Sequence, residues 1–360
     1  SLFGGTTSTV TSVAYGQDGA GNRLWVAGAA GTISALAYSY NGTNWIAISG
    51  SKTALFGGNA EVSSVAYGQD SEGNRLWIAG SQGDNATLAY SSNGTNWTSI
   101  SGSKTALFGG AFCGVLSVAY GRDSGGNRLW VAGANAFSTT AILAYSSNGI
   151  TGWTPIANSK TNLFGANSAI NSVSFGKDGT GNRLWVAGAT SAAGVAVLAY
   201  SSDGTTNWTA ISGSKTNLFG GNARVNSVKY GESGTGATGR LWVAGAVGTT
   251  SILAYSSNGT GWTAVANSQT TIFGGNSVAW SLGYGENTLG YPLWIAGGNG
   301  TNAVFASSVS SQIIPIGGMI GVGENQGINA IAIGQGAGAY TQGESAIAIG
   351  QFAGQTNQGT

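Results

Sequence analysis

The chain has 360 residues, with 13 Lys or Arg, 12 Asp or Glu, a formal net charge of +1, no histidine and one cysteine. These counts exclude a Ser-His-Asp triad, a histidine metal site, an intrachain disulfide and a thiolate zinc cluster. Because there is no basic run, we expect no nucleic-acid partner. Because the longest uncharged apolar stretch is too short for a bilayer, we expect no membrane insertion. We also expect no metal and no cofactor.

Six copies of one unit fill residues 1–316. Each copy contains Leu-Trp followed by Val or Ile, Ala and Gly, and successive tryptophans of this motif are 52 to 57 residues apart. These tryptophans are Trp25, Trp77, Trp130, Trp185, Trp242 and Trp294. Each copy predicts four short strands, rich in β-formers and bounded by Gly, Asn, Asp and Ser. In the second copy they cover residues 64–68, 75–80, 87–92 and 97–101.

Four short strands in a repeat of this length are typical of a β-propeller blade. We therefore predict an all-β fold with a six-bladed propeller, whose blades cover about residues 1–52, 53–104, 105–160, 161–215, 216–269 and 270–316. A phenylalanine precedes the first strand of every copy, starting with Phe3, so the first linker is complete. This favours a closed ring over an open array. The fourth strand of the last copy is assigned to residues 312–316, which do not match the other copies.

The turn between the third and fourth strands has a recurrent pattern. It reads Tyr-Ser-Ser-Asn-Gly-Thr-Asn-Trp at residues 90–97 and Tyr-Ser-Ser-Asp-Gly-Thr-Thr-Asn-Trp at residues 200–208. A short Asn or Asp side chain can accept hydrogen bonds from the N–H groups of the turn, and glycine can adopt a positive φ. The pattern resembles the Asp-box hairpin of sialidase-like propellers, in which the box supports the fold and supplies no catalytic group.

A different repeat of 16 residues begins near residue 323. Residues 329–338 return at residues 345–354, and alternating Ile and Ala before glycine predict one strand and one tight turn per repeat. A single coil of this kind cannot bury its apolar face without stacked neighbours or other chains. The segment resembles the head repeats of trimeric autotransporter adhesins, which have counterparts in phage tail fibres and large-virus surface proteins. The resemblance implies a parallel β-roll in residues 317–360 that makes the chain a homotrimer.

The loops between the second and third strands differ among the copies, so the scaffold does not dictate their residues. In a four-stranded blade these loops lie on the same face as the linkers. We take this face as the candidate binding surface for a receptor or glycan. The candidate binding residues are Gln82, Asp84, Asn85, Asn135 and Phe137. The alternative is that these are plain solvent-exposed loops.

Acidic and basic residues also recur with the repeat. The acids after the first strand are Asp18, Asp70, Asp123, Asp178, Glu232 and Glu286, and the arginines at the second strand are Arg23, Arg75, Arg128, Arg183 and Arg240. One hypothesis is a ring of acid–arginine pairs that binds a carboxylated sugar. We favour an ion pair that closes each hairpin, because residues present in every copy usually serve the repeat. The linker lysines Lys52, Lys104, Lys160 and Lys215 are predicted to lie in solvated loops.

Three functional hypotheses follow. The leading one is a non-enzymatic attachment protein, extracellular or on a virion surface, with a propeller head on a trimeric fibre. The alternative is an architectural capsid-decorating or filament subunit that binds its own kind. A sialidase-like enzyme comes third, because only Arg122 and Arg224 lie outside the repeat pattern of arginines and no pair of carboxylates suits glycoside hydrolysis. We therefore predict no catalytic residues and no enzyme activity.

Overall fold

The computed structural model describes residues 2–5, 8–110, 112–136, 139–192, 194, 196–232, 239–287, 292–309, 314–316, 331–333, 340–342, 347–349 and 356–358. The chain forms two compact units, Ser1–Val265 and Ala266–Thr360. The described parts of both units are built from β-strands, joined in places by single helical turns. This confirms the all-β class.

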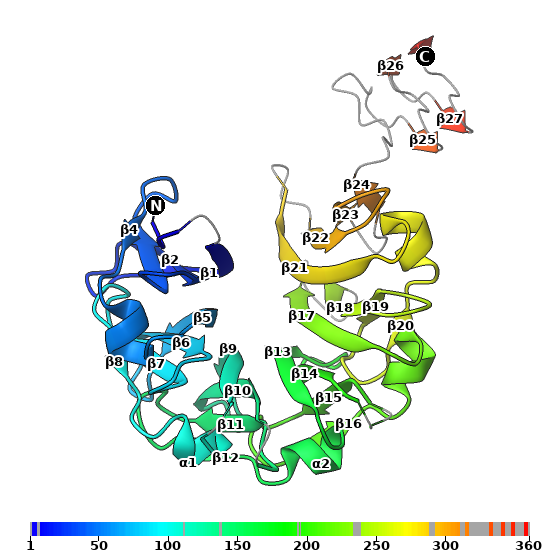
Figure 1. Ribbon diagram of the computed structural model, residues 1–360. Coiled ribbons are helices and arrows are strands. Elements are labelled where there is room, and N and C mark those ends of the chain that lie inside the picture. The colour runs from blue at the N-terminus through cyan, green and yellow to red at the C-terminus, as the bar shows by residue number, and fades with distance from the viewer. Residues whose placement is uncertain are drawn as a thin grey trace. The chain divides into compact units, whose positions relative to one another are not determined.

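Five antiparallel meanders of four consecutive strands make up the first unit, and we call them blades 1 to 5 (Figure 1). Their strands are β1 (Thr9–Gln17), β2 (Arg23–Ala30), β3 (Leu36–Ser39) and β4 (Ile46–Ala47); β5 (Val62–Gln69), β6 (Arg75–Ser81), β7 (Leu88–Ser91) and β8 (Thr98–Ser99); β9 (Gly114–Arg122), β10 (Arg128–Asn135), β11 (Leu143–Ser146) and β12 (Thr154–Pro155); β13 (Ala169–Lys177), β14 (Arg183–Thr190), β15 (Leu198–Ser201) and β16 (Trp208–Ala210); and β17 (Arg224–Glu232), β18 (Arg240–Val247), β19 (Leu253–Ser256) and β20 (Thr263–Ala264). The first strands of neighbouring blades lie side by side. The predicted strands of the second copy are therefore confirmed, with bounds that differ by at most two residues.

A single helical turn forms each linker after a blade. These turns are η1 (Ser51–Phe56), α1 (Thr105–Phe108), α2 (Ser159–Leu163) and η2 (Ser214–Leu218). The turns begin after Gly50, Asn158 or Gly213 at positive φ, or after Lys104 in the ordinary helical region. The linker phenylalanines Phe56, Phe108, Phe164 and Phe219 are fully buried. Each linker therefore attaches itself to the blades by its phenylalanine side chain.

The tryptophan of each second strand joins its blade to the preceding one. The indole Nε1 of Trp77, Trp130, Trp185 and Trp242 donates a hydrogen bond of 2.9–3.0 Å to the backbone oxygen of Gln17, Gln69, Arg122 and Lys177, respectively. All four indoles are fully buried. The carbonyl oxygen at the end of the first strand in blades 1 to 4 is thereby satisfied by the next blade.

An aromatic ring and a glycine complete the contact between neighbouring blades. The ring of Tyr120 packs on Trp130 with centroids 5.0 Å apart, and a Cβ added to Gly68 of blade 2 would overlap that tyrosine ring. Ser64 Oγ accepts a hydrogen bond of 3.0 Å from the N–H of Val118. The same glycine, aromatic and serine positions recur between the other blades of the first unit. These residues recur in the sequence because each holds the neighbouring blade.

The second unit begins with a meander of the same kind, β21 (Val278–Glu286), β22 (Pro292–Asn299), β23 (Phe305–Val309) and β24 (Ile314–Ile316), after the helical turn η4 (Ser268–Phe273). The fourth strand predicted near residues 312–316 is confirmed at β24. The 16-residue repeats contribute β25 (Ile331–Ile333), β26 (Tyr340–Gln342), β27 (Ile347–Ile349) and β28 (Thr356–Gln358).

The 16-residue repeats pair in parallel. β25 pairs with β27 so that Ile331 lies opposite Ile347, and β26 pairs with β28 so that Tyr340 lies opposite Thr356. In both ladders, each residue thus pairs with the equivalent residue of the next repeat. The prediction of one strand per repeat is wrong, because each repeat contributes a second strand after the glycine-rich segment. That second strand lacks the Ile-Ala alternation and so gave no sequence signal. The rest of residues 317–360 lies outside the described part of the chain.

We predict that replacing Trp130 by Phe lowers the free energy of unfolding by about 2 kcal/mol, because the carbonyl of Gln69 loses its donor inside a buried contact. The matched control is Trp45→Phe, which also loses a hydrogen bond, from Nε1 to Gly42 O at 3.0 Å, but in an exposed turn. Urea denaturation should show a change within about 0.5 kcal/mol for this control. Equal losses in the two variants would contradict the role given to the inter-blade tryptophan.

Candidate functional site

The candidate residues of the linker-face loops lie apart from one another. Gln82 and Asn135 occupy equivalent positions at the ends of the second strands of blades 2 and 3, and both are half-buried. Asp84 and Asn85 are exposed in the loop of blade 2, where Asp84 Oδ2 accepts a hydrogen bond of 3.2 Å from the N–H of Asn59. Phe137 lies outside the described residues. None of the three pockets described below is lined by these residues, so their role stays a prediction.

The linkers hold these loops from two sides. Lys104 Nζ donates to the backbone oxygens of Gly83 at 2.9 Å and Asp84 at 3.1 Å, and the N–H of Asn85 donates to Phe56 O at 2.8 Å. Lys52, Lys160 and Lys215 likewise donate to the carbonyls of their own blade's loop. The prediction that the linker lysines are solvated is wrong for Lys160 and Lys215, whereas Lys52 and Lys104 are half-buried. Lys160 and Lys215 are 6% and 8% exposed, because the ammonium groups satisfy loop carbonyls that have no strand partner.

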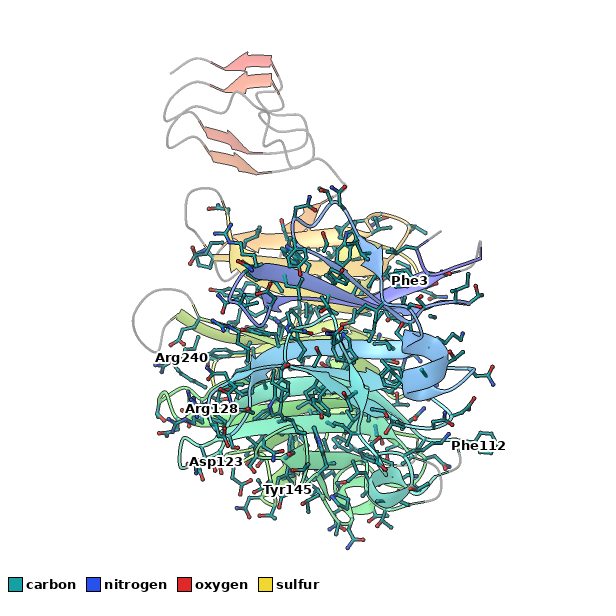
Figure 2. All side chains as sticks on the ribbon, turned by 90° about the vertical axis from the view of Figure 1, so that its left-hand side faces the viewer. Phe3, Phe112, Asp123, Arg128, Tyr145 and Arg240 are labelled. Carbon is teal, nitrogen blue, oxygen red and sulfur yellow. The ribbon has the colours of Figure 1, made fainter. Side chains whose placement is uncertain are left out.

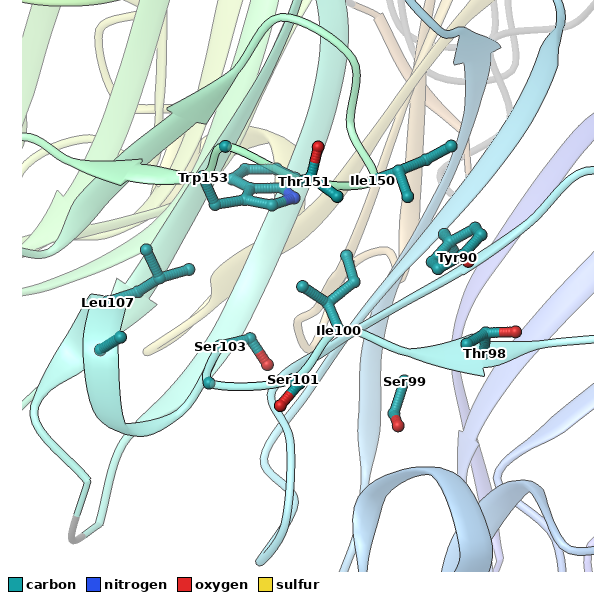
Figure 3. A pocket seen from close by; sticks show the side chains of 13 residues that line it. Tyr90, Thr98, Ser99, Ile100, Ser101, Ser103, Leu107, Ile150, Thr151 and Trp153 are labelled. Atoms are coloured by element: carbon teal, nitrogen blue, oxygen red, sulfur yellow. The ribbon is translucent and has the colours of Figure 1, made fainter.

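A groove with aromatic walls lies between blades 2 and 3, and we call it the rim groove (Figure 3). It has a volume of about 390 Å³ and is lined by Tyr90, Thr98, Ser99, Ile100, Ser101, Gly102, Ser103, Ala106, Leu107, Ile150, Thr151, Gly152 and Trp153. Figure 3 shows Ile150, Thr151 and Trp153 on one side of the groove and Ser99 and Ser101 on the other. The groove therefore combines two aromatic rings and several aliphatic side chains with a few hydroxyl groups.

The turn between β11 and β12 fixes the position of Trp153. Asn148 Oδ1 accepts hydrogen bonds from the N–H groups of Ile150 at 2.9 Å and Thr151 at 2.8 Å. Gly149 has a φ of 75°, and its carbonyl oxygen accepts a hydrogen bond of 2.9 Å from Trp153 Nε1. This is the capped turn expected from the sequence. It orients the indole ring at the wall of the groove.

Two further pockets occupy equivalent places on the opposite side of the blades from the linkers. One, of about 510 Å³, lies between blades 1 and 2 and is lined by Gln17, Gly19, Tyr67, Gln69, Gly73, Asn74, Arg75 and Ser92. The other, of about 480 Å³, lies between blades 3 and 4 and is lined by Ser124, Lys177, Asp178, Gly181, Asn182, Arg183, Leu184 and Ser202. We call them seam pockets. Figure 2 shows Asp123, Arg128 and Arg240 on this hairpin side and Phe3 and Phe112 on the other.

The hairpin ion pairs predicted for each blade are wrong for blades 1, 2, 3 and 4, where the acid accepts hydrogen bonds from the asparagine four residues later. The carboxylate of Asp70 accepts hydrogen bonds from the N–H and the side-chain amide of Asn74, both at 2.9 Å. Arg75 instead reaches the preceding blade, where its Nε donates to Gln17 Oε1 at 3.1 Å. An asparagine four residues after the acid occupies the carboxylate, which leaves the arginine for the neighbouring blade. Among the described residues of the five blades in the first unit, only blade 5 has an ion pair of the predicted kind, Arg240 to Glu232 at 3.1 Å.

Asp178 in the second seam pocket is also held by its own turn. Burial alone would raise the pKa of Asp178, but hydrogen bonds from the side chain and N–H of Thr180 and from Asn182 outweigh burial and lower this pKa. The carboxylate is therefore ionised at neutral pH and engaged by hydrogen bonds. It closes the hairpin and is poorly suited to act as a general acid.

Because the pKa of Asp178 is lower in the folded protein, its contribution to the free energy of unfolding decreases as the pH falls. The ionised carboxylate stabilises the fold above the unfolded value near 3.8, and this contribution disappears as the pH falls through the lower folded value. We predict that Asp178→Asn reduces the difference between the free energies of unfolding measured in urea at pH 7 and pH 3. An unchanged difference would contradict the capping role of this carboxylate.

Comparison with known proteins agrees with the fold. No protein-family model and no characterised protein matches the sequence. The lectin BP39L from Burkholderia pseudomallei is 19% identical, with a TM-score of 0.57 over 85% of this chain and 84% of the lectin. The chain is similar to 32% of the extracellular domain of a hybrid two component system from B. thetaiotaomicron, at 12% identity and a TM-score of 0.47 over 79% of this chain. An α-L-arabinanase from Penicillium chrysogenum is 12% identical, with a TM-score of 0.45 over 81% of this chain and 89% of the enzyme.

At these identities the likeness concerns the fold, and it shows an all-β, β-propeller-like structure. In the described residues, no helix is long and apolar enough to span a bilayer. No group of three or more Cys, Asp or Glu side chains in that same part of the chain is placed to hold a metal ion.

Proposed function

We propose that the chain is a non-enzymatic, extracellular glycan-binding protein that attaches its carrier to a receptor. The rim groove between blades 2 and 3 carries this proposal. The apolar face of a sugar ring packs well on an aromatic side chain, while hydroxyl groups at the edge fix its orientation. Trp153 and Tyr90 supply the aromatic rings, and Ser99, Ser101 and Thr151 supply hydroxyl groups. The likeness of the fold to that of a lectin supports the same function.

The lining of the pockets favours binding over hydrolysis. Glycoside hydrolysis ordinarily requires two carboxyl groups that flank the scissile bond. Among the residues that line the rim groove and the two seam pockets, Asp178 is the one carboxylate, and it is engaged in its own turn. The linker-face loops with Gln82, Asp84, Asn85 and Asn135 are a second candidate surface, for a protein receptor.

We further propose that the meanders form a six-bladed propeller. Blade 1 exposes Val10, Val13 and Tyr15 by 51%, 52% and 49%, whereas their counterparts Val62 and Val65 in blade 2 are buried by blade 1. The equivalent aliphatic pairs of blades 3, 4 and 5 are buried as well, and a propeller would leave no first strand with an uncovered apolar face.

Replacing Trp153 by Ala should weaken binding of a neutral oligosaccharide about tenfold or more, because the stacking surface is lost. The ligand is first selected on a glycan array with the intact chain and then titrated by calorimetry. Trp97→Ala is the matched control, since Trp97 makes the same 2.9 Å bond to the glycine of its turn but lines none of the three pockets. Equal losses for both variants, or no glycan bound by the intact chain, would contradict the proposal.

The 16-residue repeats are proposed to make the protein a homotrimer. Their described strands already pair in parallel within one chain, and stacking with other chains would bury the remaining apolar faces. We predict by light scattering a trimer for residues 1–360 and a monomer for a chain that ends at Ile316. Oligomers of both would instead favour the architectural alternative, in which propeller contacts assemble the particle.

A further inference from the structure

The residue that ends the first strand of each blade is placed to receive the arginine of the next blade. In blades 1 to 5 this residue is Gln17, Gln69, Arg122, Lys177 and Glu232. Gln69 shows the ordinary arrangement. Its Nε2 donates to Gly73 O in its own hairpin at 3.0 Å, while its Oε1 accepts a bond of 3.1 Å from Arg128 Nε of blade 3. A glutamine therefore satisfies its own turn and the neighbour's guanidinium at once.

Blade 3 departs from this arrangement, because Arg122 can donate hydrogen bonds but cannot accept them. Its Nη1 donates to Gly126 O at 2.8 Å, as Gln69 does in its own turn. Arg183 of blade 4 therefore has no acceptor for its Nε across the seam. Its one hydrogen bond within the described structure runs from Nη1 to Ser124 O at a long 3.5 Å.

The guanidinium groups of Arg122 and Arg183 both lie close to Gly126. Arg122 bonds the carbonyl of this glycine, and a Cβ built on Gly126 would lie 3.0 Å from Arg183 Nη2. Like charges are thus brought together beside the seam pocket of about 480 Å³, where Arg183 is exposed. Since each guanidinium presents several N–H donors in a planar fork, the pair is suited to an anion that lies between them.

Of the other charged groups around this pocket, Lys177 is paired with an acid, while the carboxylates of Asp178 and Asp123 accept hydrogen bonds from neutral groups of their own turns. Lys177 Nζ lies 2.8 Å from Glu232 Oε2, and Asp178 is engaged in its own turn. Asp123 of blade 3 accepts bonds from the N–H of Asn127 at 2.8 Å and from its side-chain amide at 2.9 Å. At the seam between blades 4 and 5, Glu232 bridges Lys177 and Arg240, so the cations there are neutralised within the protein. The seam between blades 3 and 4 has no such bridge among the described residues.

We propose that the seam between blades 3 and 4 binds the carboxylate or sulfate group of an acidic sugar, held between Arg122 and Arg183. Ser202 lines the same pocket and offers a hydroxyl group to a sugar, while Asn182, whose Nδ2 donates to Thr180 Oγ1 at 2.8 Å, offers its Oδ1 as an acceptor. This inference rests on the proposed glycan-binding function and names its ligand class. The seam pocket between blades 1 and 2 has a similar set of lining residues. There, however, Arg75 Nε already donates a hydrogen bond to Gln17 Oε1, so this pocket lacks the anion site.

Arg122→Gln tests the proposal, because it places at this position the residue that blades 1 and 2 have there. By analogy with Gln17 and Gln69, the new side chain would accept a hydrogen bond from Arg183 Nε, so the variant should fold at least as stably as the wild type. Calorimetry on the full chain would compare hyaluronan hexasaccharide, which carries carboxylates, chondroitin sulfate hexasaccharide, which adds sulfates, and neutral chitohexaose. We expect Arg122→Gln to weaken binding of an acidic probe about tenfold or more and to leave chitohexaose unaffected.

Arg128→Gln is the control, since it removes the counterpart of Arg183 from a seam where Gln69 accepts its hydrogen bond, and so removes one positive charge as Arg122→Gln does. This variant should bind the acidic probes like the wild type. Binding of hyaluronan would assign the site to carboxylates, and binding of the sulfated probe alone would assign it to sulfates. The proposal is overturned by equal losses in the two variants, by equally tight binding of inorganic sulfate, or by wild-type protein that binds neither acidic probe. Loss of neutral-glycan binding at the rim groove is a separate readout that bears on the proposed function.

Discussion

The structure depends on a tryptophan that each of blades 2 to 5 inserts against the blade before it. Its indole ring is fully buried, and its N–H group satisfies the last carbonyl of the preceding first strand, as in Trp130 and Gln69. This one contact combines burial of a large aromatic surface with satisfaction of a carbonyl that would otherwise be left unpaired inside the protein. The recurrent glycine exists because the next blade's tyrosine ring needs its space, as Gly68 and Tyr120 show. A chain with few charges follows from the same requirement, since most of each blade faces another blade.

Positions that do not serve this contact are the ones that vary, and these are where function is proposed. Ile150 stands in a turn where blade 2 has Thr95, and it helps to line the rim groove. Arg122 stands where blades 1 and 2 have glutamine, and it leaves Arg183 without its usual acceptor. Both changes alter a surface between blades and leave the buried tryptophans in place. A repeated scaffold can therefore vary at one seam while the contacts between its blades are kept.

The sequence was sufficient to predict the strands, the order of the blades and the capped turns, because these follow from local patterns. It was insufficient wherever the partner of a side chain comes from another part of the fold. Arg75 was expected to pair within its own hairpin but crosses to Gln17, and Lys160 was expected in solvent but is buried against Ala136 O. The rim groove and the seam pockets were missed for the same reason, since each is formed by two blades. The unusual residue at position 122 was visible in the sequence, but its meaning depends on the arginine that faces it.

The most direct test of the central claim is to observe the arginine Nε–Hε resonances of the full chain by NMR during titration with chondroitin sulfate hexasaccharide. If departures from the repeat create the binding site, the resonances of Arg183 and Arg122 should shift with saturation. Those of Arg75 and Arg128, whose Nε groups already have glutamine acceptors, should stay in place. Equal shifts of all four would show that the protein attracts acidic glycans through its general charge, and would contradict the account.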